Sequence, residues 1–158
     1  MDPHQFLDFA RRMRRQHVVN EETDSRVGVD RSYYAAALVT WGTLCGWTRT
    51  VLGDASAKDL ELLSEYIHSV IRFVLQKIDS PYNSMIRELF GYRKRASYFM
   101  SACVDYDLLD DAIDLAQKIL GGQRDIAVHL NRAYDRDLID GSSWEDMKAR
   151  LDKRPRID

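Results

Sequence analysis

The sequence predicts an all-α protein, a single antiparallel helical bundle of five to six main helices with a short C-terminal helix. Apolar residues recur every three or four positions along most of the chain. No segment shows the sustained alternation of a half-buried strand, and Gly, Pro or Asp-Gly breaks separate the periodic stretches. The 158 residues suit one domain, predicted over residues 1–151, with a basic flexible tail over residues 152–158.

The first part of the chain is expected to hold three helices. The first spans residues 3–16, because an aspartate N-cap precedes a proline at the first helical position. A polar loop is expected over residues 18–29. A long buried helix follows over residues 30–52 and is ended by Gly53. One continuous apolar stripe predicts the third helix over residues 56–78.

The second part is expected to hold the remaining helices. A Ser-Pro pair begins the fourth helix, over residues 81–102. The fifth spans residues 108–120 and is ended by a Gly-Gly pair. A sixth helix is expected over residues 123–138. After an Asp-Gly turn, the short last helix begins near Ser143.

The charge balance and the cysteines limit which partners and which cellular compartment we expect for this chain. The 23 basic and 25 acidic residues nearly cancel, so any basic site must be local. Cys45 and Cys103 lie in apolar stretches without metal-ligand spacing, and we expect buried free thiols suited to a reducing cytoplasm. The N-terminus lacks the apolar run of a signal peptide, and no stretch reaches the ~18 apolar residues of a membrane span. We therefore expect a cytoplasmic protein without a membrane partner.

Three stretches together resemble the HEPN family. RSYYAAALVTW (residues 31–41) is similar to a tyrosine- and alanine-rich helix of these proteins, and RKRASY (residues 93–98) to a later segment that often has Asp where this chain has Ser97. DDAIDLAQKIL (residues 110–120) resembles the helix that follows. The resemblance implies a helical bundle that is commonly dimeric. Many HEPN proteins are metal-independent ribonucleases of toxin–antitoxin or antiphage systems, and others are non-catalytic adaptors or nucleotide-binding modules.

RSYYAAA allows two interpretations. Tyr33 and Tyr34 combine a large apolar body with a polar tip, and the alanines beside them let a neighbouring helix approach closely. On this interpretation the segment packs, and Arg31 pairs with an acidic residue. The alternative is that Arg31 and Tyr34 line a cleft and contact RNA phosphate.

RDIAVH (residues 124–129) matches the R-x4–6-H motif of active HEPN ribonucleases. RNA cleavage without a metal needs an acid or base near the 2′-hydroxyl and a cation near the phosphate. The resemblance implies that His129 is the general acid/base and that Arg124 binds phosphate. Asp125, one helical turn before His129, is expected to orient the imidazole. Asn131 stands where some members of the family have Tyr.

Helical geometry and chance both weigh against this motif. On one helix Arg124 and His129 lie about 140° apart and ~7.5 Å along the axis, so the site needs a wrapping Arg124 side chain or a second chain. With 4 His and 17 Arg, about 1.3 matches to the spacing arise by chance. RMRRQH, from Arg12 to His17, is such a second match. It is interpreted either as complementing a helix dipole or as a second phosphate-binding pair.

Two function classes follow for this sequence. The leading hypothesis is a HEPN-like metal-independent endoribonuclease, a homodimer acting on RNA in stress response or antiphage defence. The alternative is a non-catalytic HEPN-like interaction module that binds a nucleotide or a partner protein, as a scaffolding or neutralising subunit beside an antitoxin or another defence protein. No cofactor or metal is expected, because Walker, dinucleotide-binding and zinc-protease motifs are lacking.

Overall fold

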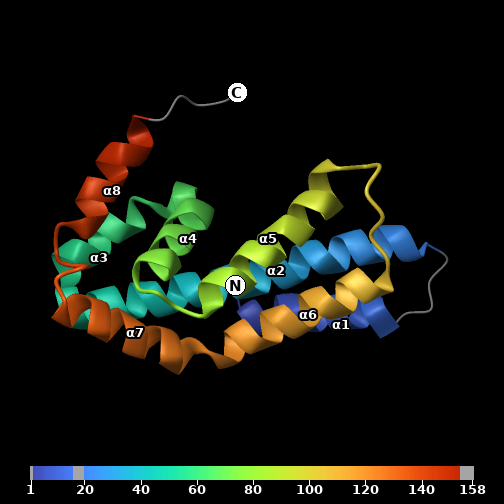
Figure 1. Cartoon of the computed structure of the whole chain (residues 1–158), viewed down its shortest axis with the longest axis horizontal. Helices are drawn as coiled ribbons and strands as arrows, with labels where there is room; N and C mark the ends of the chain where they lie inside the picture. Colours follow the sequence, from blue (N-terminus) through green and yellow to red (C-terminus); the bar gives the residue numbers. More distant parts are fainter. Residues whose placement is uncertain (1, 16–19, 154–158) are drawn as a thin grey trace. The chain divides into compact units, whose positions relative to one another are not determined.

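The computed structural model describes residues 2–15 and 20–153, and this part of the chain contains helices and no strand. The predicted all-α class is therefore confirmed, whereas the arrangement as one antiparallel bundle stays a prediction. Eight α-helices follow one another in the described part (Figure 1): α1 (Pro3–Arg15), α2 (Glu21–Trp47), α3 (Asp54–Glu61), α4 (Ile67–Lys77), α5 (Tyr82–Tyr98), α6 (Tyr106–Gly121), α7 (Gln123–Asp135) and α8 (Ser143–Asp152).

The helices form two compact units, each built from two separate stretches of chain. Unit 1 takes Met1–Thr40 and Pro81–Gln123, and unit 2 takes Trp41–Ser80 and Arg124–Asp158. The long helix α2 contributes to both units. The prediction of a single domain is not decided by this division. The predicted basic tail lies outside the described residues from position 154 onward.

The core of unit 1 is built around the small residues of α2. Ala35, Ala36 and Ala37 are at most 1% exposed, and Gly28 faces Leu109 of α6 so closely that an added Cβ would lie 2.6 Å from a leucine methyl. Small residues let helix axes approach, which increases the apolar area that each pair buries. Helix α6 also contacts α1 and α5, and Figure 1 shows α6 beside α1.

The core of unit 2 contains the apolar stripe predicted for the third helix. Leu60, Val70 and Ile71 are fully buried, and Trp144 of α8 is 1% exposed. Helix α3 contacts α8, and the Ser56 hydroxyl donates a hydrogen bond to the carbonyl of residue 141 at 3.2 Å. The unit therefore joins segments that are far apart in sequence.

The expected loop over residues 18–29 is wrong from residue 21 onward, where α2 begins. The Asn20 side chain accepts a hydrogen bond from the Thr23 amide at 3.3 Å, which is an N-cap interaction. The acidic residues that suggested a loop occupy the first turn, where negative charge complements the helix dipole: Glu21, Glu22 and Asp24.

Other helix ends also differ from the prediction, and the sixth predicted helix ends at Asp135 instead of residue 138. A π-helical turn (Thr48–Leu52) follows α2 and leads into Gly53, whose φ of 94° favours glycine. The expected helix over residues 56–78 is broken, because Leu62 ends α3 and a 3₁₀ turn (Ser64–Tyr66) precedes α4. The fourth helix ends at Tyr98 instead of residue 102.

The cysteines are less buried than expected. Cys103 is exposed and Cys45 is half-buried, and both are free. Burial raises the pKa of Cys45 to about 11, with a smaller contribution from Glu61. The prediction of a buried thiol is thus wrong for Cys103. In the described part of the chain, no helix has the length and apolar character needed to cross a membrane.

Candidate functional sites on α5 and α7

RDIAVH lies at the start of α7, but its arginine and histidine do not share a face. Ile126 and Leu130 are buried and fix which side of α7 packs. Arg124 is exposed and lies about 140° from the centre of that buried side by helical geometry. His129 is half-buried at its edge. Within one chain, α7 therefore separates the two side chains instead of bringing them together on a phosphate.

His129 has nearer charged neighbours along α7. Asp125 precedes it by four residues and Arg132 follows it by three, and side chains at these spacings lie next to one another on a helix. Arg132 is exposed. The R-x4–6-H pattern misses it because the pattern considers only arginines that precede the histidine. The spacing of His129 and Arg132 on one helical face is the signal that identifies it.

Only the arginine of the second arginine–histidine match lies within the described residues. Arg12 is exposed on α1, with its guanidinium carbon 5.7 Å from the centre of the Phe9 ring. His17 lies outside the described residues. The structure therefore gives no geometry for this pair.

Arg31 and Tyr34 take part in packing within unit 1. The Arg31 guanidinium lies over two aromatic rings of α1, 5.4 Å from Phe6 and 5.7 Å from Phe9. The Tyr34 hydroxyl accepts a hydrogen bond from Arg93 at 3.0 Å. Aromatic rings thus take the place of the acidic partner expected for Arg31.

Arg93 joins two of the stretches that resemble the HEPN family. Its guanidinium pairs with Asp30 at 3.0 Å and lies over the rings of Tyr33 and Tyr34. Burial opposes the charge of Arg93, but the hydrogen bond to Asp30 and nearby negative charge hold its pKa above the ordinary value. The Ser97 hydroxyl donates to the same carboxylate at 3.4 Å. This cluster has the character of a packing centre.

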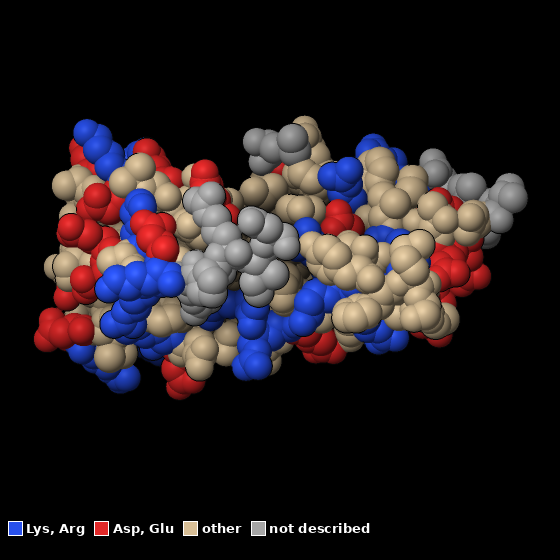
Figure 2. All heavy atoms as spheres, turned by 90° about the horizontal axis from the view of Figure 1, so that it is seen from above, with Lys and Arg blue, Asp and Glu red and all other residues tan. Residues whose placement is uncertain are grey.

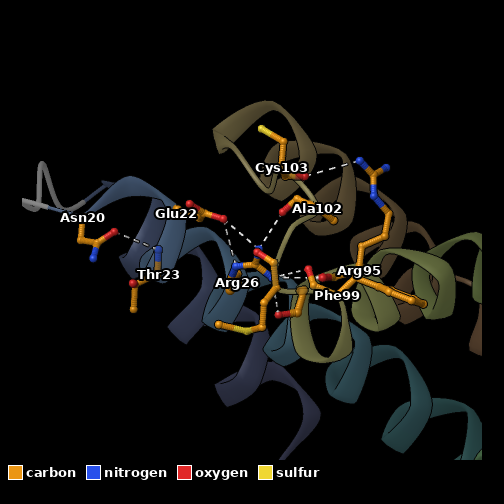
Figure 3. A network of polar contacts seen from close by, with 10 residues as sticks. Asn20, Glu22, Thr23, Arg26, Arg95, Phe99, Ala102 and Cys103 are labelled. Carbon is orange, nitrogen blue, oxygen red and sulfur yellow. Dashed lines mark hydrogen bonds and ion pairs between the residues drawn. The ribbon is translucent and has the colours of Figure 1, made fainter.

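Arg26 organises the end of α5 (Figure 3). It pairs with Glu22 at 2.8 Å. Its guanidinium also donates to five backbone carbonyls, those of Arg95, Ala96, Phe99, Met100 and Ala102, at 2.6–3.3 Å. The carbonyls at a helix C-terminus have no partner within the helix, and Arg26 supplies one. We call this arrangement the Arg26 clamp.

A basic and aromatic surface lies beside the clamp. We call Arg87, Gly91, Lys94 and Tyr98 the α5 outer face, because they recur at helical spacing and lie on one side of α5. Tyr98 and the two residues after it form an exposed hydrophobic corner: Tyr98 is 65% exposed, Phe99 56% and Met100 80%. Figure 2 shows an uncharged surface over this end of α5, with both basic and acidic groups beside it.

Three cations of α5 are not neutralised by a described carboxylate. Arg87, Lys94 and Arg95 are exposed and form no ion pair within the described part of the chain. Lys94 lies 5.2 Å from the centre of the Phe90 ring, and Arg95 donates to the Cys103 carbonyl. Glu88, the one acidic residue of α5, accepts a hydrogen bond from the Tyr92 hydroxyl. Basic side chains therefore outnumber acidic ones within α5.

Among the described side chains, no three His, Cys, Asp or Glu residues form a group that could hold a metal ion. The aspartates around the start of α6 have structural contacts instead. Asp105 caps α6 by accepting from the Leu108 amide at 3.0 Å, and Asp110 pairs with Arg14 of α1 at 2.8 Å. Comparisons with family models, curated proteins and solved structures found no match for this chain.

Proposed function

We propose that the protein is a non-catalytic, HEPN-like interaction module that binds an anionic partner through the α5 outer face. The observation that carries the proposal is the pair of cations on this face without a described ion pair, Arg87 and Lys94, beside an exposed hydrophobic corner. A contiguous exposed apolar patch with charge at its rim is typical of a binding surface. The HEPN resemblance suggests a scaffolding or neutralising subunit of a defence or toxin–antitoxin system.

Two observations favour binding over catalysis. The family-like stretches belong to unit 1, whereas Arg124 and His129 belong to unit 2. Metal-free cleavage of RNA also needs the cation and the acid/base on the same phosphate, and α7 directs Arg124 away from His129. Arg31 and Tyr34 contact other side chains of unit 1, so they support the fold of the module.

The experiment is an RNA cleavage assay in the presence of a chelator. Purified chain and its His129→Ala variant are incubated with mixed cellular RNA, and the products are separated on a denaturing gel. We expect intact RNA with both proteins, and no toxicity when either is expressed. Cleavage by the wild type that disappears in His129→Ala would overturn the proposal.

A second candidate function is the metal-independent endoribonuclease, favoured by the neighbours of His129. Asp125 lies one turn before His129 and suits the orienting role, and Arg132 on the same face suits phosphate binding. In this candidate a homodimer supplies Arg124 from the second chain. Loss of cleavage in both His129→Ala and Arg132→Ala, with His17→Ala still active, would support it.

A further inference from the structure

We propose that the anionic partner of the α5 outer face is a single-stranded nucleic acid, whose bases stack on Tyr98 and Phe99 and whose phosphates contact Arg87 and Lys94. This inference rests on the proposed function and names the chemical class of the partner. Its basis is a row of cations along one helix that is followed by exposed rings at the C-terminal end of that helix.

The spacing of the cations along the helix suits contacts with successive phosphates of a nucleic-acid strand. Arg87 and Lys94 are separated by two helical turns, about 10 Å along the axis, on the same side of α5. Gly91 lies between them, and a Cβ added there would meet no atom within 4 Å. The surface between the two charges is thus open. A positive groove or strip that follows the phosphates is one of the two requirements for sequence-tolerant binding of single strands.

The rings provide the second requirement. Tyr98 and Phe99 expose more than half of their surface at the end of the same row of cations. Each nucleobase has a flat π face that can stack on such a ring, whereas the bases of a duplex are already stacked on one another. Exposed rings therefore favour an unpaired strand.

The Arg26 clamp favours binding of a single strand at the exposed hydrophobic corner in two ways. It holds the carbonyls of Phe99 and Met100, so the backbone that bears the rings is ordered before a ligand arrives. It also satisfies carbonyls at the C-terminus of α5 that would otherwise repel phosphate. Both effects favour an anionic strand at this end of the helix.

Charge composition argues against a protein partner at this surface. Protein interface cores are depleted of lysine, whereas Lys94 lies one helical turn before Tyr98 on the α5 outer face. Glu88 is the single acidic side chain of α5, and the Tyr92 hydroxyl donates to it. The ligand that satisfies both the rings and the cations has planar apolar groups on an anionic backbone.

The test is fluorescence anisotropy with three labelled probes: a 20-nucleotide oligo(U) RNA, an oligo(dT) of the same length and a 20-base-pair duplex. We expect the full chain to bind both single strands more tightly than the duplex. The RNA and DNA arms then report any contact with the 2′-hydroxyl. Tyr98→Ala should weaken binding about 5- to 100-fold, and Tyr98→Phe should retain it. Lys94→Ala should lower the salt dependence of binding by about 0.7 in the log–log slope.

Unit 2 offers a matched control. Lys77 lies 5.5 Å from the ring centre of Phe73, which is 40% exposed, and so repeats the arrangement of Lys94 over Phe90. Lys77→Ala and Phe73→Ala should leave binding unchanged. Circular dichroism melting of each variant confirms that the compared proteins are folded.

Failure of this inference and failure of the proposed function give different results in these experiments. Tighter binding to the duplex, or single-strand binding that Tyr98→Ala and Lys94→Glu leave unchanged, would overturn the inference. If no oligonucleotide binds but poly-glutamate binds in a way that needs Lys94, the inference fails and the interaction module stands. Cleavage of the RNA probe that is lost in His129→Ala would overturn the proposed function and leave the binding result to be judged by itself.

Discussion

Arg26 contributes strongly to stability, because one side chain provides donors to five carbonyls and one carboxylate. Only 13% of its side chain is exposed. Arg26→Ala would remove these charged hydrogen bonds and leave Glu22 unpaired. We expect the free energy of unfolding, measured by urea titration, to fall by about 2–3 kcal/mol. Arg26→Lys should recover only part of this, because an ammonium group cannot reach as many carbonyls.

Arg49 in unit 2 is the matched control for Arg26. It also pairs with acidic groups, Glu61 at 3.0 Å and Asp54 at 3.8 Å, but its side chain is 64% exposed. Solvent screens such a pair, so Arg49→Ala should lower the free energy of unfolding by less than about 1 kcal/mol. Equal losses for Arg26→Ala and Arg49→Ala would contradict the role assigned to the clamp.

At the scale of helices, the contact between Gly28 of α2 and Leu109 of α6 sets how closely the two pack. A Cβ at position 28 would lie 2.6 Å from a leucine methyl that is fully buried. Gly28→Ala should therefore lower the free energy of unfolding by about 1–3 kcal/mol, since a packed core resists added volume. In the double variant with Leu109→Ala, the effect of Gly28→Ala should shrink, which a double-mutant cycle measures.

Gly42, in the same helix, separates packing from helix propensity. A Cβ added there meets no atom within 4 Å. Gly42→Ala should therefore raise the free energy of unfolding by about 0.5–1 kcal/mol, because alanine restricts the unfolded chain and favours the helix. Destabilisation by both glycine substitutions would show that the contact with Leu109 is not the cause.

The sequence predicts helix ends best where a glycine or a proline interrupts the helix. Gly53, the Ser80-Pro81 pair and the Gly121-Gly122 pair all lie at or beside helix ends, as expected. The start of α2 is not predictable in this way, because a cluster of polar residues fits both a loop and a capped first turn. The break after Leu62 also lacks a local signal, since no glycine or proline marks it. Local patterns do not contain this information.

The candidate sites show the same limit. The Arg26 clamp depends on carbonyls about seventy positions away in the sequence, so no spacing rule finds it. Arg87, Lys94 and Tyr98 of the α5 outer face recur at helical spacing, but spacing alone does not reveal that these side chains are exposed, which the structure shows. Arg124 and His129 fit a motif by spacing, and only the buried side of α7 reveals that they diverge.

At the scale of the whole molecule, the chain passes between the two units three times. One passage falls inside α2, between Thr40 and Trp41. Each unit is discontinuous in sequence, so neither can be produced by a single cut of the chain. All three tryptophans, Trp41, Trp47 and Trp144, belong to unit 2. Tryptophan fluorescence therefore reports the unfolding of unit 2, whereas circular dichroism reports both units.

Because all three tryptophans lie in unit 2, their fluorescence can test whether α2 makes the two units unfold together. Gly28→Ala acts in unit 1, yet we expect it to lower the urea midpoint seen by tryptophan fluorescence as much as that seen by circular dichroism. Once unit 1 unfolds, the remaining part of α2, Trp41 to Trp47, is too short to persist as a helix by itself. Trp47, which is 7% exposed in the folded protein, would then lose its place in the core of unit 2.

Gly42→Pro is the complementary variant, because it interrupts α2 just beyond the passage between the units. Proline removes one backbone hydrogen bond and its ring clashes with the carbonyl of Leu38. If helix continuity couples the units, the fluorescence and circular dichroism transitions should separate in Gly42→Pro and coincide in Gly42→Ala. A fluorescence midpoint that stays fixed in Gly28→Ala would mean that the units unfold independently and that α2 joins them only as a covalent connection.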